Sequence, residues 1–121
     1  MTDTELVNAW RGLLERYHAT SCALDRELNE KHQLGVSEFE VLERLDQNEE
    51  CMRIQELAAS VHLSQSALSR VVARLERDFL VTREICATDR RGVYVKLTDT
   101  GAQRYTEALP TQRAVLADNL A

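Results

Sequence analysis

The sequence has little of several residue types, and each shortage excludes a class of protein. One proline and four glycines among 121 residues argue against a loop-rich or disordered chain. Aromatic residues make up 5%, so aliphatic side chains must fill most of the core. The three cysteines, Cys22, Cys51 and Cys86, are an odd number without a CxxC spacing. They therefore predict reduced thiols in a cytoplasmic protein and no disulfide framework.

Long apolar runs are missing as well. No segment approaches the ~20 apolar residues that a membrane-spanning helix needs. The N-terminal MTDTELVNAW has neither the basic start nor the apolar stretch of a signal peptide. We therefore expect one compact cytoplasmic domain without a membrane partner.

The net charge is −5, yet the charges are unevenly distributed. Residues 1–52 carry 5 basic and 12 acidic side chains, residues 53–97 carry 8 and 5, and residues 98–121 carry 2 and 3. A basic central block within an acidic chain is typical of a surface that binds nucleic acid.

The N-terminal segment has the apolar spacing of a long helix. Thr2 and Glu5 have capping-box spacing, and Gly35 is expected to end the helix after about 28 residues. Its apolar stripe consists of Leu6, Trp10, Leu13, Leu14, Tyr17, Leu24 and Leu28. A helix this long overhangs a small core, so we expect the stripe to meet a second copy of the chain. The alternative is that the helix packs across its own domain.

Three shorter helices are expected next. Ser37 and Glu40 form a second capping box and predict a helix to about residue 47, followed by a polar loop. Arg53 is a poor N-cap for a short helix over residues 54–61. After a turn, Ser64 caps a helix that reaches about Asp78.

After Leu80 the apolar period changes to two. VTREIC and VYVKL predict a hairpin around ATDRRG, with Gly92 closing the loop. Val93, Val95 and Leu97 are expected to fasten the second strand to the core. Thr98 caps a last helix, which Pro110 is expected to end or kink.

This order of elements predicts a mainly α fold with a small β-hairpin, namely a winged helix-turn-helix. We expect an N-terminal dimerisation helix over residues 1–34, a DNA-binding lobe over 35–98 and C-terminal dimerisation helices over 99–121. Together they are expected to form one compact domain.

The helix after Ser64 has the composition of a recognition helix in a DNA major groove. Small polar residues near its start allow close approach to base edges, and glutamine and arginine read bases. The candidate DNA-binding residues are Ser64, Gln65, Ser66, Ser69, Arg70, Arg74 and Arg77. Ser64 and Ser66 are also candidates for phosphate contacts. The alternative is an ordinary solvated helix face.

The hairpin loop carries Arg90 and Arg91, which suit the electronegative minor groove. Asp89 is expected to anchor one of these arginines, since a phosphate would repel its carboxylate. The alternative is a charged turn without a ligand.

Two motifs together resemble the MarR family of bacterial transcriptional regulators. They are SQSALSRVVARLE and DRRGVYVKLTDTG, and the resemblance covers roughly residues 34–105. It implies a homodimeric winged-helix repressor or activator, with N- and C-terminal helices at the dimer interface. It also implies that Arg91 is the wing arginine, that Asp89 and Arg90 complete the wing signature, and that double-stranded DNA is the partner.

The sequence departs from the family pattern at two places. Phe79 stands where the family usually has glycine, so the end of the preceding helix is expected to be built differently. The chain also stops soon after Pro110, so its dimer interface is expected to depend mainly on the N-terminal helix.

The N-terminal helix also carries candidates for sensing. Trp10, Tyr17, His18 and His32 are candidate effector-pocket residues for a small-molecule partner, or else ordinary core and surface residues. Cys22 is a candidate redox thiol near Arg26, or else a plain buried thiol. His18 and Cys22 are two potential metal ligands, but His62, Cys51 and Cys86 are not obviously near, so we predict no metal site.

No set of residues suggests an enzyme or a cofactor. Ser64 and His62 are near in sequence but lack a third partner, and no phosphate-binding loop is present. The alternative to a DNA-binding regulator is a winged-helix adaptor that binds proteins, because fold alone does not settle function.

Overall fold

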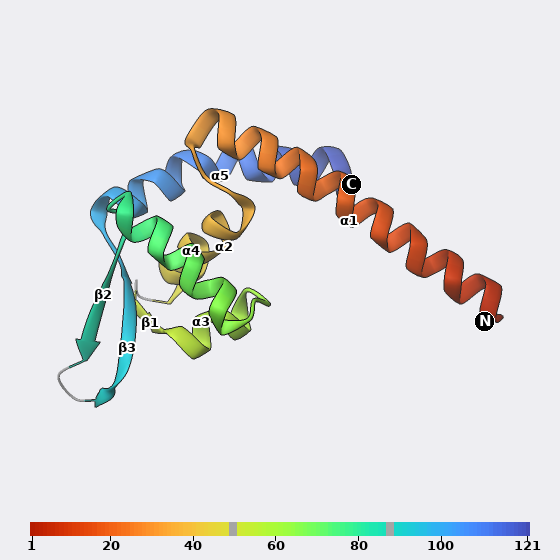
Figure 1. Cartoon of the computed structure of the whole chain (residues 1–121). Helices are drawn as coiled ribbons and strands as arrows, with labels where there is room; N and C mark the ends of the chain where they lie inside the picture. Colours follow the sequence, from red (N-terminus) through yellow and green to blue (C-terminus); the bar gives the residue numbers. More distant parts are fainter. Residues whose placement is uncertain (49–50, 87–88) are drawn as a thin grey trace. The chain divides into compact units, whose positions relative to one another are not determined.

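The computed structural model describes residues 1–48, 51–86 and 89–121; the side chains of residues 86 and 89–91 lie outside that description. Within it, the chain forms five helices and a three-stranded antiparallel sheet, which confirms the predicted fold class (Figure 1). The helices are α1 (Asp3–His32), α2 (Val36–Gln47), α3 (Ile54–Ser60), α4 (Gln65–Arg77) and α5 (Asp99–Leu120). The strands are β1 (Cys51–Arg53), β2 (Val81–Cys86) and β3 (Asp89–Leu97).

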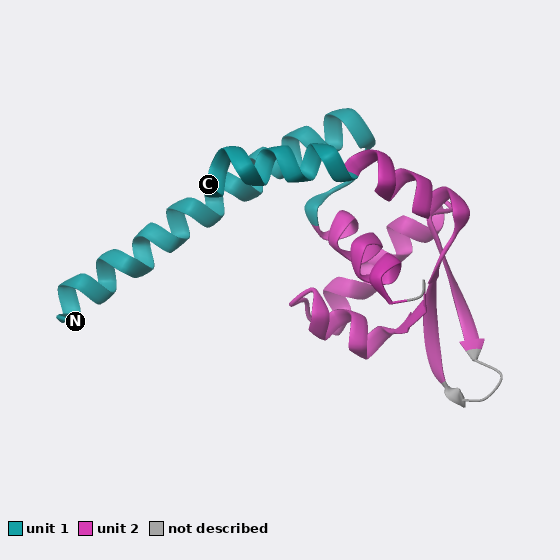
Figure 2. Ribbon diagram, turned by 180° about the vertical axis from the view of Figure 1, so that it is seen from behind, with its two compact units in different colours: residues 1–36, 109–121 teal, residues 37–108 magenta. Residues whose placement is uncertain are grey.

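The chain divides into two compact units, coloured separately in Figure 2. Unit 1 contains residues 1–36 and 109–121, and unit 2 contains residues 37–108. The first half of α5, which the sequence assigned to the C-terminal segment, therefore groups with unit 2. None of the helices in the described ranges is long and apolar enough to cross a membrane.

In unit 1, α1 and the C-terminal part of α5 lie side by side (Figures 1 and 2). The predicted capping box of Thr2 and Glu5 is present. The helix ends at His32, because Gln33 takes a left-handed conformation with φ 55° and the Leu34 N–H donates to the Leu28 carbonyl. The prediction that Gly35 ends this helix is therefore wrong.

The N-terminal half of α1 has no buried residue. Every residue from 1 to 19 is exposed, and burial within α1 begins at Thr20 and continues at Leu24 and Leu28. Six large apolar or aromatic side chains of this segment are 44% to 71% exposed: Leu6, Val7, Trp10, Leu13, Leu14 and Tyr17. Single chains seldom leave an apolar stripe of this length exposed to water.

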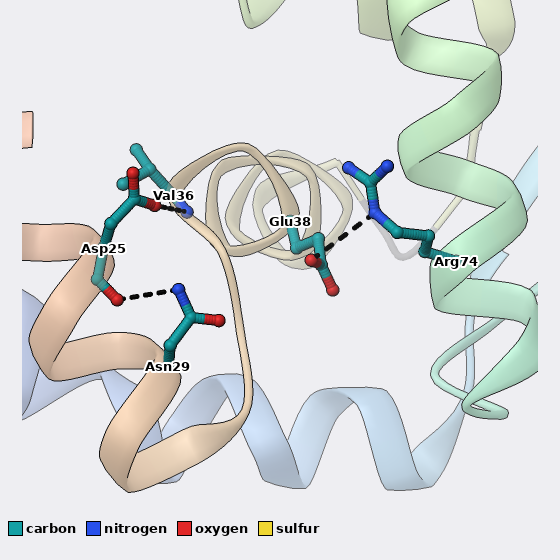
Figure 3. A network of polar contacts seen from close by, with 5 residues as sticks. All are labelled: Asp25, Asn29, Val36, Glu38 and Arg74. Carbon is teal, nitrogen blue, oxygen red and sulfur yellow. Dashed lines mark hydrogen bonds and ion pairs between the residues drawn. The ribbon is translucent and has the colours of Figure 1, made fainter.

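The α2 helix begins at Val36, two residues before the start that a Ser37 N-cap predicts. The Val36 N–H donates to Asp25 Oδ1 at 3.1 Å, which satisfies a backbone donor at the start of the helix (Figure 3). Ser37 therefore lies inside the first turn, and the predicted Ser37–Glu40 capping box is wrong.

Unit 2 contains the helix-turn-helix. As predicted, Ser64 caps α4 by accepting the Ala67 N–H at 3.1 Å, and Arg53 precedes α3 without a side-chain cap bond. The inward face of α4 is buried as expected at Leu68, Val71, Val72 and Leu75. The core also contains a tilted Phe39–Tyr105 ring pair and a 2.8 Å bond from the Tyr105 hydroxyl to the Glu43 carboxylate.

The strand order is β1-β3-β2, and the β2–β3 hairpin is the wing. The segment before Arg53, expected to be a polar loop, instead includes β1. A three-residue strand shows no periodicity, and it forms because β3 offers a partner edge. Gly92 lies within β3 without a positive φ, so the prediction that it closes the loop is wrong.

Core packing holds only the inner part of the wing. Val81, Val95 and Leu97 are buried, whereas the cross-strand pair Ile85 and Val93 is 71% and 42% exposed. The prediction that Val93 fastens the strand to the core is therefore wrong. The hairpin extends past the core before it reaches this pair.

Pro110 does not end α5. The helix continues to Leu120 although proline removes one backbone donor. Gln112 and Val115, beyond the proline, are buried in unit 1, so tertiary packing outweighs the local cost.

The junction of β3 and α5 is tightly packed against the start of β2. The Thr98 hydroxyl lies 2.7 Å and 3.0 Å from the carbonyls of Phe79 and Leu80, to which it donates, and it accepts the Gly101 N–H at 2.9 Å. A Cβ atom at Gly101 would lie 2.0 Å from the Leu80 carbonyl oxygen. Only glycine therefore fits at position 101.

The C-terminus of α4 keeps the usual left-handed turn without a glycine. Phe79 has φ 61° and is 77% exposed, and the Leu80 N–H donates to the Leu75 carbonyl at 2.9 Å. The expectation that this helix end is built differently is therefore wrong. The backbone bond of Leu80 and the Thr98 hydroxyl, which donates to the Phe79 carbonyl, hold Phe79 in the left-handed conformation. This conformation costs a residue with a Cβ about 1–2 kcal/mol.

We therefore expect Phe79→Gly to raise the free energy of unfolding by about 1 kcal/mol. Urea unfolding followed by circular dichroism measures this change. Phe79→Ala is the matched control, since it removes the same exposed ring but keeps the strained Cβ. Equal stability of the two variants would show that backbone strain is not the cause.

Candidate nucleic-acid interface

The outward face of α4 is polar and basic. Gln65, Ser66, Arg70 and Arg77 are exposed, and Ser69 is half-buried. Before Glu76 the helix has no acidic residue. This face combines short polar side chains near the N-terminus with arginines further along, as the sequence predicted.

Ser64 has a structural role in addition to its predicted contact with DNA. Its hydroxyl accepts the Ala67 N–H and lies 3.3 Å from the Ser66 hydroxyl. The Ser64 side chain is thereby held at the positive end of α4, where an anion is favoured.

Arg74 points toward α2 instead of straight outward. Its Nε lies 3.7 Å from Glu38 Oε1, and the two side chains face each other in Figure 3. Because the Glu38 side chain is only 14% exposed, this ion pair lies at the edge of the core. Arg74, one of the predicted recognition-helix arginines, thus contacts α2.

The wing contacts α4 through a residue that the sequence did not single out. Arg83 on β2 places its Nε 2.6 Å from Glu76 Oε1 and its Nη2 3.5 Å from the Ser69 carbonyl oxygen. Both partners belong to α4. The only sequence signal for this contact is the basic character of residues 53–97 as a whole.

The inner edge of the wing has a second arginine contact. Arg53 Nε donates to the Tyr94 hydroxyl at 3.1 Å, and its guanidinium lies 5.6 Å from the centre of the Tyr94 ring. Glu56 Oε1 lies 3.9 Å from the same Nε. From the sequence, Arg53 is predicted only to be a poor N-cap, and its contact with Tyr94 has no local signal.

The predicted wing residues Asp89, Arg90 and Arg91 belong to β3 by their backbone. Their side chains lie outside the described part of the chain, so their assignment to the minor groove stays a prediction.

The sensing candidates on α1 do not gather at one place. Trp10, Tyr17 and His18 are exposed, while His32 is half-buried and 2.8 Å from the Thr111 hydroxyl of α5. His32 therefore links the two helices of unit 1. The effector pocket stays a prediction.

Cys22 is exposed, so the alternative of a plain buried thiol is wrong for the single chain. Its sulfur lies 3.6 Å from His18 Nε2, one turn earlier on α1. Across the described residues, no three His, Cys, Asp or Glu side chains are grouped to hold a metal ion.

Comparison with known proteins identifies the family. The model of the MarR family matches residues 34–93. The structure is similar to that of AbsC from Streptomyces coelicolor, a MarR family transcriptional regulator, with 33% identity and a TM-score of 0.88 over 99% of this chain and 80% of that one. The chain belongs to the MarR family.

Two other relatives extend the comparison. Sco3205 from Streptomyces coelicolor, solved in complex with DNA, has 28% identity and a TM-score of 0.91, covering 99% of this chain and 76% of that chain. The transcriptional regulator MhqR of Bacillus subtilis is 30% identical over 84 residues, which is 69% of this chain. This chain spans 57% of the length of MhqR.

Members of the MarR family are transcription regulators and not enzymes. The sequence places one serine and one histidine, Ser64 and His62, close together. Ser64 is engaged as a helix cap, and His62 lies in a left-handed turn with φ 58°.

Proposed function

We propose that this protein is a homodimeric transcriptional regulator that binds a pseudo-palindromic DNA site. In this proposal, α4 enters the major groove and Arg91 of the wing enters the adjacent minor groove. The observation that carries it is the face of α4, where Gln65, Ser66 and Arg70 are exposed above a fully buried apolar side.

The exposed stripe of α1 supports the dimer. A symmetric pair of copies would cover the apolar side chains that a single chain leaves in water. It would also present two recognition helices to half-sites about one helical turn apart. A regulator bound at a promoter blocks other proteins from that DNA. We therefore propose that this protein represses transcription.

The test is to select duplexes from a random library with the 121-residue chain and then to titrate salt against binding of the enriched duplex. Arginine contacts with phosphates predict that log K falls steeply and linearly with log salt concentration. Equal binding of all duplexes, or a flat salt response, would contradict the proposal.

A winged-helix adaptor that binds proteins is the second candidate. Combined Arg70→Ala and Arg91→Ala substitutions distinguish the two, because they should abolish regulation only if DNA is the partner. Retained regulation in that variant, measured with a reporter gene, would favour the adaptor.

We expect Arg91→Ala to weaken binding to the enriched duplex by about 1–3 kcal/mol, roughly 5- to 150-fold, because a minor-groove contact is lost. Fluorescence anisotropy measures the affinity, and sedimentation should show an unchanged dimer. Lys96→Ala is the matched control, since it removes an exposed positive charge from the same strand at the base of the wing. Equal losses in both variants would indicate a general charge effect.

A further inference from the structure

The outer part of the wing lacks support from the core. In the register of the hairpin, Arg83 lies opposite the buried Val95, and the next inward-facing pair is Ile85 and Val93. Because this pair is exposed, apolar packing stops at the level of Arg83. A polar contact at the level of Arg83 therefore restrains the position of the wing more than a contact near the base of the wing does.

Arg83 makes that polar contact, and makes it with the recognition helix. Ser69 and Glu76 are about two turns apart on α4, and the long Glu76 side chain reaches back toward the N-terminus of the helix. The Arg83 guanidinium lies between them, 2.6 Å from the Glu76 carboxylate and 3.5 Å from the Ser69 carbonyl oxygen. One planar group thus joins β2 to two points of α4.

We propose that Arg83 and Glu76 are positioning residues that set the angle between the wing and the recognition helix. With this angle fixed, the two elements reach adjacent grooves of one DNA duplex in register. This inference rests on the proposed DNA-binding function. Arginine suits this role because its planar guanidinium group can donate hydrogen bonds to two acceptors at once. The lysine ammonium group is a point charge on a flexible chain and does not fix such a geometry.

The competing interpretation is that Arg83 only adds positive charge beside DNA. The two interpretations predict opposite signs for Glu76→Gln. Removing a negative charge from a DNA-binding surface strengthens binding if charge alone matters. If the ion pair positions the wing, the same substitution weakens binding although the surface becomes more basic.

Glu84→Gln provides the matched control. Glu84 is the neighbour of Arg83 on β2 and is exposed, and alternation along the strand directs it to the opposite face. Its substitution removes the same charge at nearly the same place without touching the contact to α4. We expect Glu84→Gln to bind DNA as tightly as the unsubstituted protein, or more tightly.

The experiment measures binding of the 121-residue chain and its variants to the enriched duplex by fluorescence anisotropy. Glu76→Gln and Arg83→Lys are each expected to weaken binding about three- to tenfold. The double variant Glu76→Gln/Arg83→Gln is expected to bind no more weakly than Arg83→Gln alone, since each substitution breaks the same contact. Thermal unfolding of each variant serves as the folding control. The Arg83 and Glu76 side chains are both 36% exposed, so their ion pair contributes little to stability and the Tm should hardly change.

Unchanged or tighter binding by Glu76→Gln would overturn the positioning role. Additive losses in the double variant would overturn it as well. Failure of the unsubstituted protein to enrich any duplex would instead refute the DNA-binding function, and the positioning role with it.

Discussion

Gly101→Ala is expected to lower the free energy of unfolding by about 3 kcal/mol or more, which corresponds to a fall in Tm of roughly 10 °C. The added Cβ would lie 2.0 Å from the Leu80 carbonyl oxygen and 2.8 Å from Leu97 Cδ1. The backbone carbonyl cannot rotate away, since it accepts the Thr98 N–H at 3.1 Å. Either α5 moves away from β2 or the junction between them opens.

Gly12→Ala is the matched control for Gly101→Ala. Gly12 lies within α1, and a Cβ there would meet nothing within 4 Å. This substitution should be neutral or should stabilise the helix by up to about 1 kcal/mol. Differential scanning calorimetry of both variants measures the contrast. A Gly101→Ala protein as stable as Gly12→Ala would contradict the close approach at this junction.

Leu13→Glu is expected to weaken dimerisation by about 3 kcal/mol or more, which raises the dimer Kd at least ~100-fold. Leu13 is at the centre of the exposed α1 stripe, and a second copy would bury two of the introduced carboxylates without partners. DNA affinity should fall in parallel, because a monomer engages one half-site at a time. Sedimentation velocity over a range of protein concentrations measures the change.

Asn8→Glu is the control for the charge that Leu13→Glu introduces. By helical periodicity, Asn8 is exposed on the side of α1 opposite to the stripe, so the same carboxylate should leave the dimer intact. Equal dissociation of both variants would mean that the stripe is not the interface. A monomeric unsubstituted protein would refute the proposed dimer directly.

Local sequence patterns predicted most of the winged-helix unit. The Ser64 cap, the inward stripe of α4, the start of α5 at Asp99 and the hairpin are each encoded within a few consecutive residues. Such signals are read without knowledge of distant partners, so these predictions were correct.

The errors occurred where distant contacts outweigh local preferences. The β1 strand exists only because β3 pairs with it, and α5 continues past Pro110 because buried residues follow the proline. Phe79 is left-handed against its own preference because backbone bonds and Thr98 hold it there. The same reason explains why Arg83 was overlooked as a part of the site. Its partners Ser69 and Glu76 are 14 and 7 residues away in sequence.

In the proposed dimer, the exposed N-terminal half of α1 would make the amount of folded protein depend on concentration. A helical segment that buries no side chain is marginal in water, so residues 1–19 would gain most of their stability when the second copy covers the stripe. Ordering of this segment and association of two chains are then one coupled equilibrium governed by mass action. A cell that makes little of the protein would hold it mainly as single chains with frayed N-termini. A cell that holds the protein at a concentration above the dimer Kd would contain mainly ordered dimers. The expression level would then set how much protein is able to bind DNA.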